Sequence, residues 1–311
     1  RGYSIVEVQA PYGYVLDETP IYFDVTQENS IEESGVTIIK VNKKNFAQKG
    51  TIAVEKTGEV FFGVSVSGGI DESGNELPII YQPQYEKRGL PGAVYEIVAA
   101  EDIITPDGTV RNHKGDVVDT IITDENGIAM SCELYLGEYE VREVTAPNGM
   151  VLNPESRFVE LVYAGQNVAV TETATSFENE RQKVEISLVK SIEQNERFDI
   201  GTNGEMKNIT FGLFAAEEIV SASGTSIPAN GLIEIVSLNE DGTATIKTDL
   251  PYGRYYVQEI ATDSHYKLSD AKYPIIFEYV GQDTAVVKIA VNDGKAIKND
   301  LIYGSVSGKK V

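Results

Sequence analysis

Hydrophobic and polar residues alternate along most of the chain in short runs, which is the pattern of half-buried β-strands. Val, Ile, Thr and Tyr are frequent in these runs, and turn signals rich in Gly, Asn and Asp separate them. No long stretch shows the apolar period of an amphipathic helix. The pattern therefore predicts an all-β protein with short strands and tight turns.

One strand pattern occurs three times. The copies begin at Tyr3, Tyr139 and Tyr255, and each reads Tyr-x-(Val/Ile)-x-Glu with a leucine nine residues after the glutamate. Further landmarks recur upstream of the glutamate. Tyr95 precedes Glu143 by 48 residues, and Phe211 precedes Glu259 by the same interval. Such a repeat is typical of tandem domains. The glutamates of the three copies are Glu7, Glu143 and Glu259.

The repeat sets the expected module boundaries. Residues 1–45 match the C-terminal half of a module, 46–180 and 181–300 match complete modules, and 301–311 match the start of a following one. Residues 64–90 are rich in turn signals and have no counterpart in the last copy, so we expect an insertion there.

Strand parity gives a chemical meaning to the repeat. Each complete module opens with a strand that ends in lysine and closes with a strand that ends in asparagine. Alternate residues of a strand share a face, and counting by twos places these side chains and the repeated glutamate in rows of apolar residues. We therefore expect them to face the core. The two sets are Lys56, Glu143 and Asn179, and Lys190, Glu259 and Asn299.

A buried lysine, glutamate and asparagine can react with one another. Burial lowers the pKa of a lysine and raises that of a glutamate, so both can become neutral. The amine can then attack the carboxamide while the glutamate carries protons and ammonia leaves, which produces a Lys–Asn amide bond. This reaction happens once within one chain, and the sequence shows no set of residues for enzymatic turnover. An ordinary buried ion pair is the alternative interpretation.

These residues resemble a known family. The segments YSIVEVQAPYGYVL, YEVREVTAPNGMVL and YYVQEI, with strands that end in FEN and IKN, are similar to the B-type repeats of the collagen adhesin and to related pilin and surface-adhesin domains of Gram-positive bacteria. The resemblance implies transthyretin-like, inverse immunoglobulin-type β-sandwich modules arranged as an elongated rod. It also implies Lys–Asn isopeptide bonds promoted by the glutamates. In the half-module it assigns Glu7 and Asn42, with Asn45 as the open alternative.

Composition excludes several classes of partner. The net charge of −22 would repel nucleic acid and anionic membranes, and no apolar run is long enough to span a bilayer. We read the charge chiefly as a source of solubility, with calcium or a basic partner as the alternative. A single cysteine, Cys132, excludes an internal disulfide, and its apolar neighbours predict a small core residue. We expect no cofactor and no metal.

The sequence thus favours a structural stalk or spacer of an extracellular adhesin on the cell wall of a Gram-positive bacterium, with the adjacent modules of the same protein as partners. The alternative function is an adhesive module that binds a host matrix protein or glycan directly, and the 64–90 segment is then the first place to look for the binding site.

Overall fold

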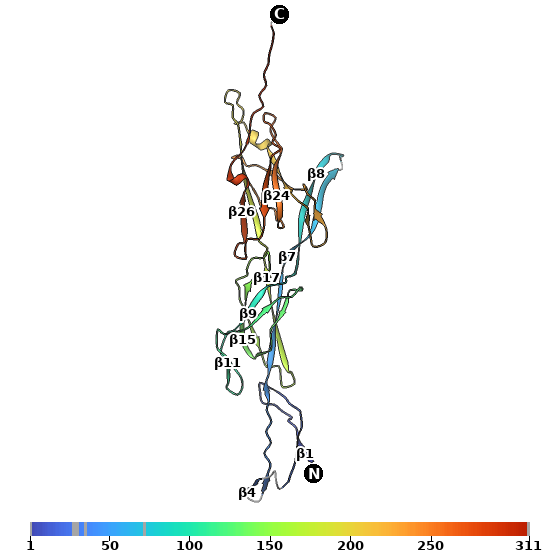
Figure 1. The fold of residues 1–311 in the computed structure, drawn as a ribbon, viewed down its shortest axis with the longest axis vertical. Helices are drawn as coiled ribbons and strands as arrows, with labels where there is room; N and C mark the ends of the chain where they lie inside the picture. The colour runs from blue at the N-terminus through green and yellow to red at the C-terminus, as the bar shows by residue number, and fades with distance from the viewer. Residues whose placement is uncertain (1, 27–30, 34–35, 71–72, 310–311) are drawn as a thin grey trace. The chain divides into compact units, whose positions relative to one another are not determined.

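The structure, a computed structural model, describes residues 2–26, 31–33, 36–70 and 73–309 (Figure 1). Within these ranges the regular elements are strands and two short 3₁₀ turns, Glu205–Asn208 and Val291–Gly294, which confirms the predicted all-β class. The chain divides into two compact units. Described residues after Leu301 form no strand, and the last two residues of the expected 301–311 segment lie outside the described ranges.

The first unit comprises 1–57, 89–147 and 152–178 and contains a β-sandwich. One sheet has the order β12-β9-β15-β16, with bounds Val117–Ile122, Val94–Ala99, Gly137–Thr145 and Arg157–Leu161. The opposite sheet is built on β7 (Lys49–Ile70), which pairs with β13 (Ile128–Met130), β14 (Leu134–Tyr135) and β17 (Val170–Asn179). Residues of both sheets share one apolar core, which includes Ile52, Tyr95, Val141 and Phe177.

The N-terminal part of this unit carries the first copy of the repeat. Its paired strands are β1 (Gly2–Ile5) with β3 (Ile21–Asp24), β2 (Tyr14–Val15) with β6 (Phe46–Ala47), and β4 (Ile31–Glu33) with β5 (Val36–Ile38). Tyr3 and Ile5, which share the face of Glu7, are 53% and 48% exposed. No second sheet covers that face among the described residues of the unit, in contrast to the sandwich over 46–180.

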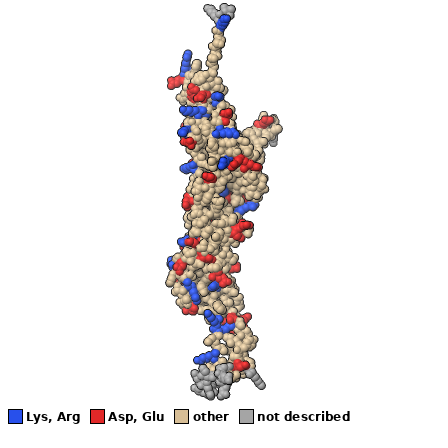
Figure 2. Space-filling model, in the orientation of Figure 1, with Lys and Arg blue, Asp and Glu red and all other residues tan. Residues whose placement is uncertain are grey.

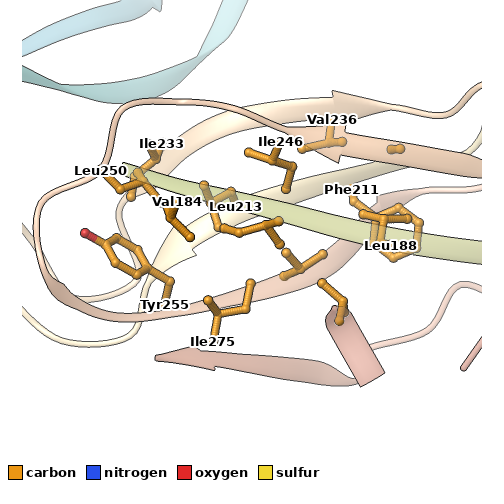
Figure 3. Packing of buried hydrophobic residues seen from close by; sticks show 14 of the residues in the cluster. Val184, Leu188, Phe211, Leu213, Ile233, Val236, Ile246, Leu250, Tyr255 and Ile275 are labelled. Carbon is orange, nitrogen blue, oxygen red and sulfur yellow. The ribbon is translucent and has the colours of Figure 1, made fainter. Parts of the chain in front are cut away.

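The second unit comprises 58–88, 148–151 and 179–311 and contains another sandwich. One sheet runs β22-β19-β24-β25, with bounds Leu232–Ser237, Thr210–Ala215, Gly253–Ala261 and Lys272–Phe277. In the other, β18 (Lys183–Ile192) pairs with β23 (Thr243–Ile246) and, in parallel, with β26 (Val286–Ala290) and β27 (Ile297–Asn299). Figure 3 shows Leu188, Phe211 and Ile246 among the side chains that fill the space between the sheets. Shorter pairs are β10 (Ile103–Ile104) with β11 (Val110–Asn112) in the first unit, and β20 (Ile219–Val220) with β21 (Ser226–Ile227) in the second.

The segment expected as a turn-rich insertion is a regular β-hairpin. Its strands are the second half of β7 (Lys49–Ile70) and β8 (Glu76–Gly89), and the Gly68-Gly69 pair and Ser73–Asn75 mark only its tip, where residues 71 and 72 lie outside the described ranges. Sequence reasoning overweighted the glycines and prolines of this segment. The hairpin belongs to the second unit, where Ile80 of β8 pairs in parallel with Leu232 of β22.

The expected burial of Cys132 is wrong, because its thiol is exposed. Ala129 and Ser131 face the core in this segment, so strand parity directs Met130 and Cys132 outward. On the face shown in Figure 2, the described basic and acidic side chains are interspersed over the surface. No helix among the described residues is long and apolar enough to cross a membrane.

Candidate functional site

Lys190, Glu259 and Asn299 meet in the core of the second unit. They lie on β18, β24 and β27, and strand parity correctly predicts their inward direction, since each is 2% exposed. Lys190 Nζ lies 3.1 Å from Glu259 Oε1 and donates a hydrogen bond to Asn299 Oδ1 at 2.6 Å. Asn299 Nδ2 donates to Glu259 Oε1 at 2.8 Å and Oε2 at 3.0 Å. Each group of this set therefore contacts the other two.

The environment shifts the protonation equilibrium of Lys190 toward its neutral form. Burial lowers the pKa of Lys190, and the nearby charge of Glu259 opposes this effect only in part. The ring of Phe211, whose centroid lies 5.6 Å from Nζ, adds apolar surroundings on one side. The amine lies against the carbonyl end of the carboxamide and the carboxylate lies against its nitrogen end. This is the arrangement that transfer of an acyl group from nitrogen to nitrogen requires.

A second lysine–glutamate pair lies in the sandwich of the first unit. Lys56 Nζ is 2.8 Å from Glu143 Oε1, and both side chains are fully buried. Burial again lowers the pKa of Lys56. Asn179 is 3% exposed and ends β17, which pairs with β7, the strand that carries Lys56. These three residues also face inward, as strand parity predicts.

The repeated glutamate has a fixed orientation that sequence reasoning missed. In all three copies its Oε2 accepts a hydrogen bond from the backbone N–H ten residues later. The donors are Asp17 at 3.1 Å, Asn153 at 2.8 Å and Ser269 at 3.0 Å. The available signal was the constant spacing from the glutamate to the leucine that precedes each donor.

In the half-module, Glu7 binds Asn45 rather than Asn42. Asn45 Nδ2 donates to Glu7 Oε1 at 2.7 Å, whereas Asn42 is exposed. The geometry thus favours the alternative that the sequence left open. A matching signal is present in the sequence, because Asn45 stands three residues before Gln48 as Asn179 stands three residues before Gln182.

Gln48 itself is a structural residue that the sequence analysis missed. Its side chain is buried, and Nε2 donates to the carbonyl groups of Gly165, at 2.9 Å, and Val168. Its Oε1 accepts from the N–H of Ala164 at 2.8 Å. Its backbone N–H donates to Gly13 O at 2.9 Å, so one residue links the half-module to the loop between β16 and β17.

Gln182 repeats this arrangement in the second unit. Nε2 donates to Gly281 O at 3.1 Å and Thr284 O at 2.7 Å, and Oε1 accepts from Val280 N at 3.1 Å. Its backbone N–H donates to Gly149 O at 3.2 Å. Each glutamine precedes its lysine by eight residues, so the repeat includes this contact as well as the three core residues.

Comparison with known proteins identifies the family of these sandwiches. The model of the SpaA prealbumin-like fold domain matches residues 79–176 and 192–296, which is more than half of the chain. The chain belongs to this family. The two matched regions of this SpaA-type chain contain both repeated glutamates of the complete modules. The resemblance to Gram-positive pilin and adhesin domains, noted from the sequence motifs, is confirmed.

Comparison with solved structures also finds chains that are similar to this SpaA-type chain. The Bacillus anthracis TIE protein is 22% identical, with a TM-score of 0.51, over 96% of this chain and 42% of its own length. The minor pilin GBS52 of Streptococcus agalactiae is 14% identical, with a TM-score of 0.27, over 84% of this chain and 100% of its own. A C-terminal fragment of the pilus adhesin SpaC of Lactobacillus rhamnosus GG is 11% identical, with a TM-score of 0.38, over 84% and 100%. The chain thus spans less than half of the TIE protein. No curated protein matches the chain.

Proposed function

We propose that this chain is a structural stalk or spacer segment of a Gram-positive cell-surface adhesin or pilus protein, in which the modules 46–180 and 181–300 each close an autocatalytic Lys–Asn isopeptide bond. The observation that carries the proposal is the buried contact of Lys190, Glu259 and Asn299. A surface location of the chain is part of this proposal.

The reaction begins with proton transfer from the Lys190 ammonium to the Glu259 carboxylate, which gives a neutral amine and a neutral acid. Nζ attacks the side-chain carbonyl carbon of Asn299, and a new C–N bond forms. The carboxyl group takes a proton from the attacking nitrogen and gives one to the leaving nitrogen. The old C–N bond breaks and ammonia forms beside Glu259, which still holds the proton that came from the lysine ammonium. Transfer of that proton to the ammonia returns the carboxylate, and the nitrogen leaves as ammonium.

Burial explains why these three residues react when surface residues of the same types do not. In water the lysine would stay protonated, and the carboxamide would be a poor acceptor. In the core the charged forms lose their hydration, so the ion pair gains less from remaining charged. The hydrogen bond of 2.6 Å from Nζ to Asn299 Oδ1 also holds the nitrogen beside the carboxamide before attack.

The position of the bond suits a protein that bears tension. β18 opens the module and β27 closes it, and the two strands are parallel neighbours. A bond between Lys190 and Asn299, which are 109 positions apart, lets force pass from the first strand to the last without separating the sheets. By analogy with disulfides, closure of such a loop stabilises the module by roughly 4–5 kcal/mol.

The glutamine contacts support the role as a spacer. In the first unit, Gln48 connects Gly13 of the half-module to the loop 164–168 of the next copy through hydrogen bonds. Tyr163 adds a hydrogen bond to the backbone of Tyr14 at 3.3 Å. Polar contacts that fix a junction favour a semi-rigid spacer over loosely linked domains.

Intact-mass measurement of the purified chain tests the proposal. We expect a mass lower than that of the sequence by two ammonia molecules, one for each complete module. Glu143→Gln and Glu259→Gln should each restore one ammonia, while the control Glu138→Gln, on the exposed face of β15, should restore none. An unshifted mass would leave ordinary buried ion pairs. Specific capture of a host matrix protein or glycan by the chain would favour the adhesive function instead.

A further inference from the structure

The leaving nitrogen of Asn299 has a third acceptor besides the two oxygens of Glu259. Asn299 Nδ2 donates to Thr262 Oγ1 at 3.0 Å. Thr262 directly follows β24 and stands three residues after the glutamate. Its hydroxyl therefore contacts an atom that changes its bonding in the proposed reaction.

The first set of residues lacks this hydroxyl. Three residues after Glu143 stands Ala146, which offers no side-chain acceptor. A different hydroxyl lies on the neighbouring strand instead. Tyr95 of β9 is the register partner of Glu143, whereas the register partner of Glu259 is Phe211. Each complete module thus has a hydroxyl at one of two positions, either three residues after the glutamate or at the register partner of the glutamate. The module 181–300 has it at the first position, and the module 46–180 has it at the second.

The Tyr95 hydroxyl has the properties of an available acceptor. The side chain is fully buried, and its oxygen has no hydrogen-bond partner among the described residues. Tyr95 and Glu143 are register partners on the neighbouring strands β9 and β15. Burial, and secondly the charge of Glu143, raises the pKa of Tyr95. The centroid of its ring lies 5.6 Å from Lys56 Nζ. A buried hydroxyl without a partner is costly, so its presence beside the glutamate needs a reason.

We propose that this hydroxyl is the acceptor for the leaving nitrogen in each module, supplied by Thr262 in 181–300 and by Tyr95 in 46–180. The inference rests on the proposed isopeptide chemistry. When the lysine nitrogen adds to the carbonyl carbon, the amide nitrogen becomes a pyramidal amine and then receives a proton from the glutamic acid. It departs as ammonia, and the hydroxyl keeps its own proton throughout.

The hydroxyl is needed because the glutamate cannot serve every N–H group at once. One glutamate oxygen exchanges protons, and the other is held by the backbone N–H of Asn153 or Ser269. When the leaving nitrogen gains a proton, it carries one more N–H group. In a buried site without water, that N–H group needs a hydrogen-bond acceptor from the protein. A neutral oxygen fixed beside the nitrogen meets this need, as preorganised groups do for charge that develops in a transition state.

Single hydroxyl removals test the inference module by module. The chain is made by cell-free synthesis, and loss of ammonia is followed over time by intact mass, with peptide mapping to assign each bond. We expect Thr262→Val to slow bond formation in 181–300 roughly tenfold or more and to leave 46–180 unchanged. Tyr95→Phe should do the reverse. Thr262→Ser should keep the rate, because it keeps the hydroxyl.

Exchange of the two positions separates this role from a loss of stability. Ala146→Thr added to Tyr95→Phe, and Phe211→Tyr added to Thr262→Val, should restore the rates. Tyr139→Phe removes a buried hydroxyl that donates to Tyr135 O and should leave the rates unchanged. Unchanged rates in both single variants, or equal slowing of both modules, would overturn the inference. If the unaltered chain loses no ammonia, the proposed function fails as well, which is a distinct result.

Discussion

Lys190 and Asn299 lie 109 positions apart in the chain, yet Lys190 Nζ donates a hydrogen bond to Asn299 Oδ1 at 2.6 Å inside the sandwich core. The contact joins the first and last strands of one module. The same relationship has two consequences that can be measured separately. One is the stability that the proposed covalent bond would add, and the other is the cost of a buried amine in a module without that bond.

Removal of the asparagine should show the first consequence. Asn299→Ala prevents the bond and leaves the loop between β18 and β27 open. We expect the unfolding free energy of the module to fall by roughly 4 kcal/mol and its melting temperature by roughly 10 °C or more, measured by calorimetry. Asn203→Ala, in an exposed loop of the same module, is the matched control. Equal melting temperatures for the two variants would argue against a bond at Asn299.

The pH dependence of the unlinked module should show the second consequence. Burial lowers the pKa of Lys190 below its ordinary value of 10.5, so the folded state binds fewer protons than the unfolded state in the interval below 10.5. The stability of Asn299→Ala should therefore rise as the pH is raised toward 10.5. Urea unfolding at several pH values measures this slope. Lys190→Met added to Asn299→Ala is the comparison, and it should remove the rise.

Strand parity is the part of the site that the sequence predicts well. The rows Ile52, Val54 and Lys56, and Tyr139, Val141 and Glu143, are buried because every second residue of a strand faces the same sheet surface. The repeat then identifies the side chains that belong together. In the half-module the sequence assigned Asn42, whereas Glu7 contacts Asn45. Both asparagines lie in an irregular stretch, where strand parity gives no direction.

The contacts that sequence reasoning missed depend on partners that are distant in the chain. Gln48 is a polar residue between two strands, and nothing local indicates that a loop more than a hundred residues away needs its carboxamide. The hairpin of β7 and β8 was missed for a related reason. Its glycines and prolines weaken the local strand pattern, and the partner that stabilises it, β22, lies beyond the next module boundary.

The two glutamines should contribute to stability through the loops that they hold. Gln48→Ala leaves the Ala164 N–H and two carbonyl groups without their partners, so we expect a loss of roughly 1–3 kcal/mol. Hydrogen exchange should become faster at 164–168. Gln182→Ala should produce the same effect at 280–284. The exposed Gln194→Ala is the control, and exchange that stays slow in both loops would contradict this role.

Arg181 should be essential for the packing of the β7–β8 hairpin within the second unit. Its guanidinium lies 3.4 Å from the ring centroid of Tyr85 in β8 and makes ion pairs with Asp249, at 2.5 Å, and Glu59 of β7, at 3.3 Å. A lysine cannot reproduce a planar group that stacks on a ring and binds two carboxylates. We expect Arg181→Lys to cost about 2 kcal/mol in unfolding free energy and to expose the hairpin to limited proteolysis. Arg254→Lys, at an exposed position of β24, should change neither measurement. If Arg181→Lys leaves proteolysis of 58–88 unchanged, then backbone pairing alone holds the hairpin.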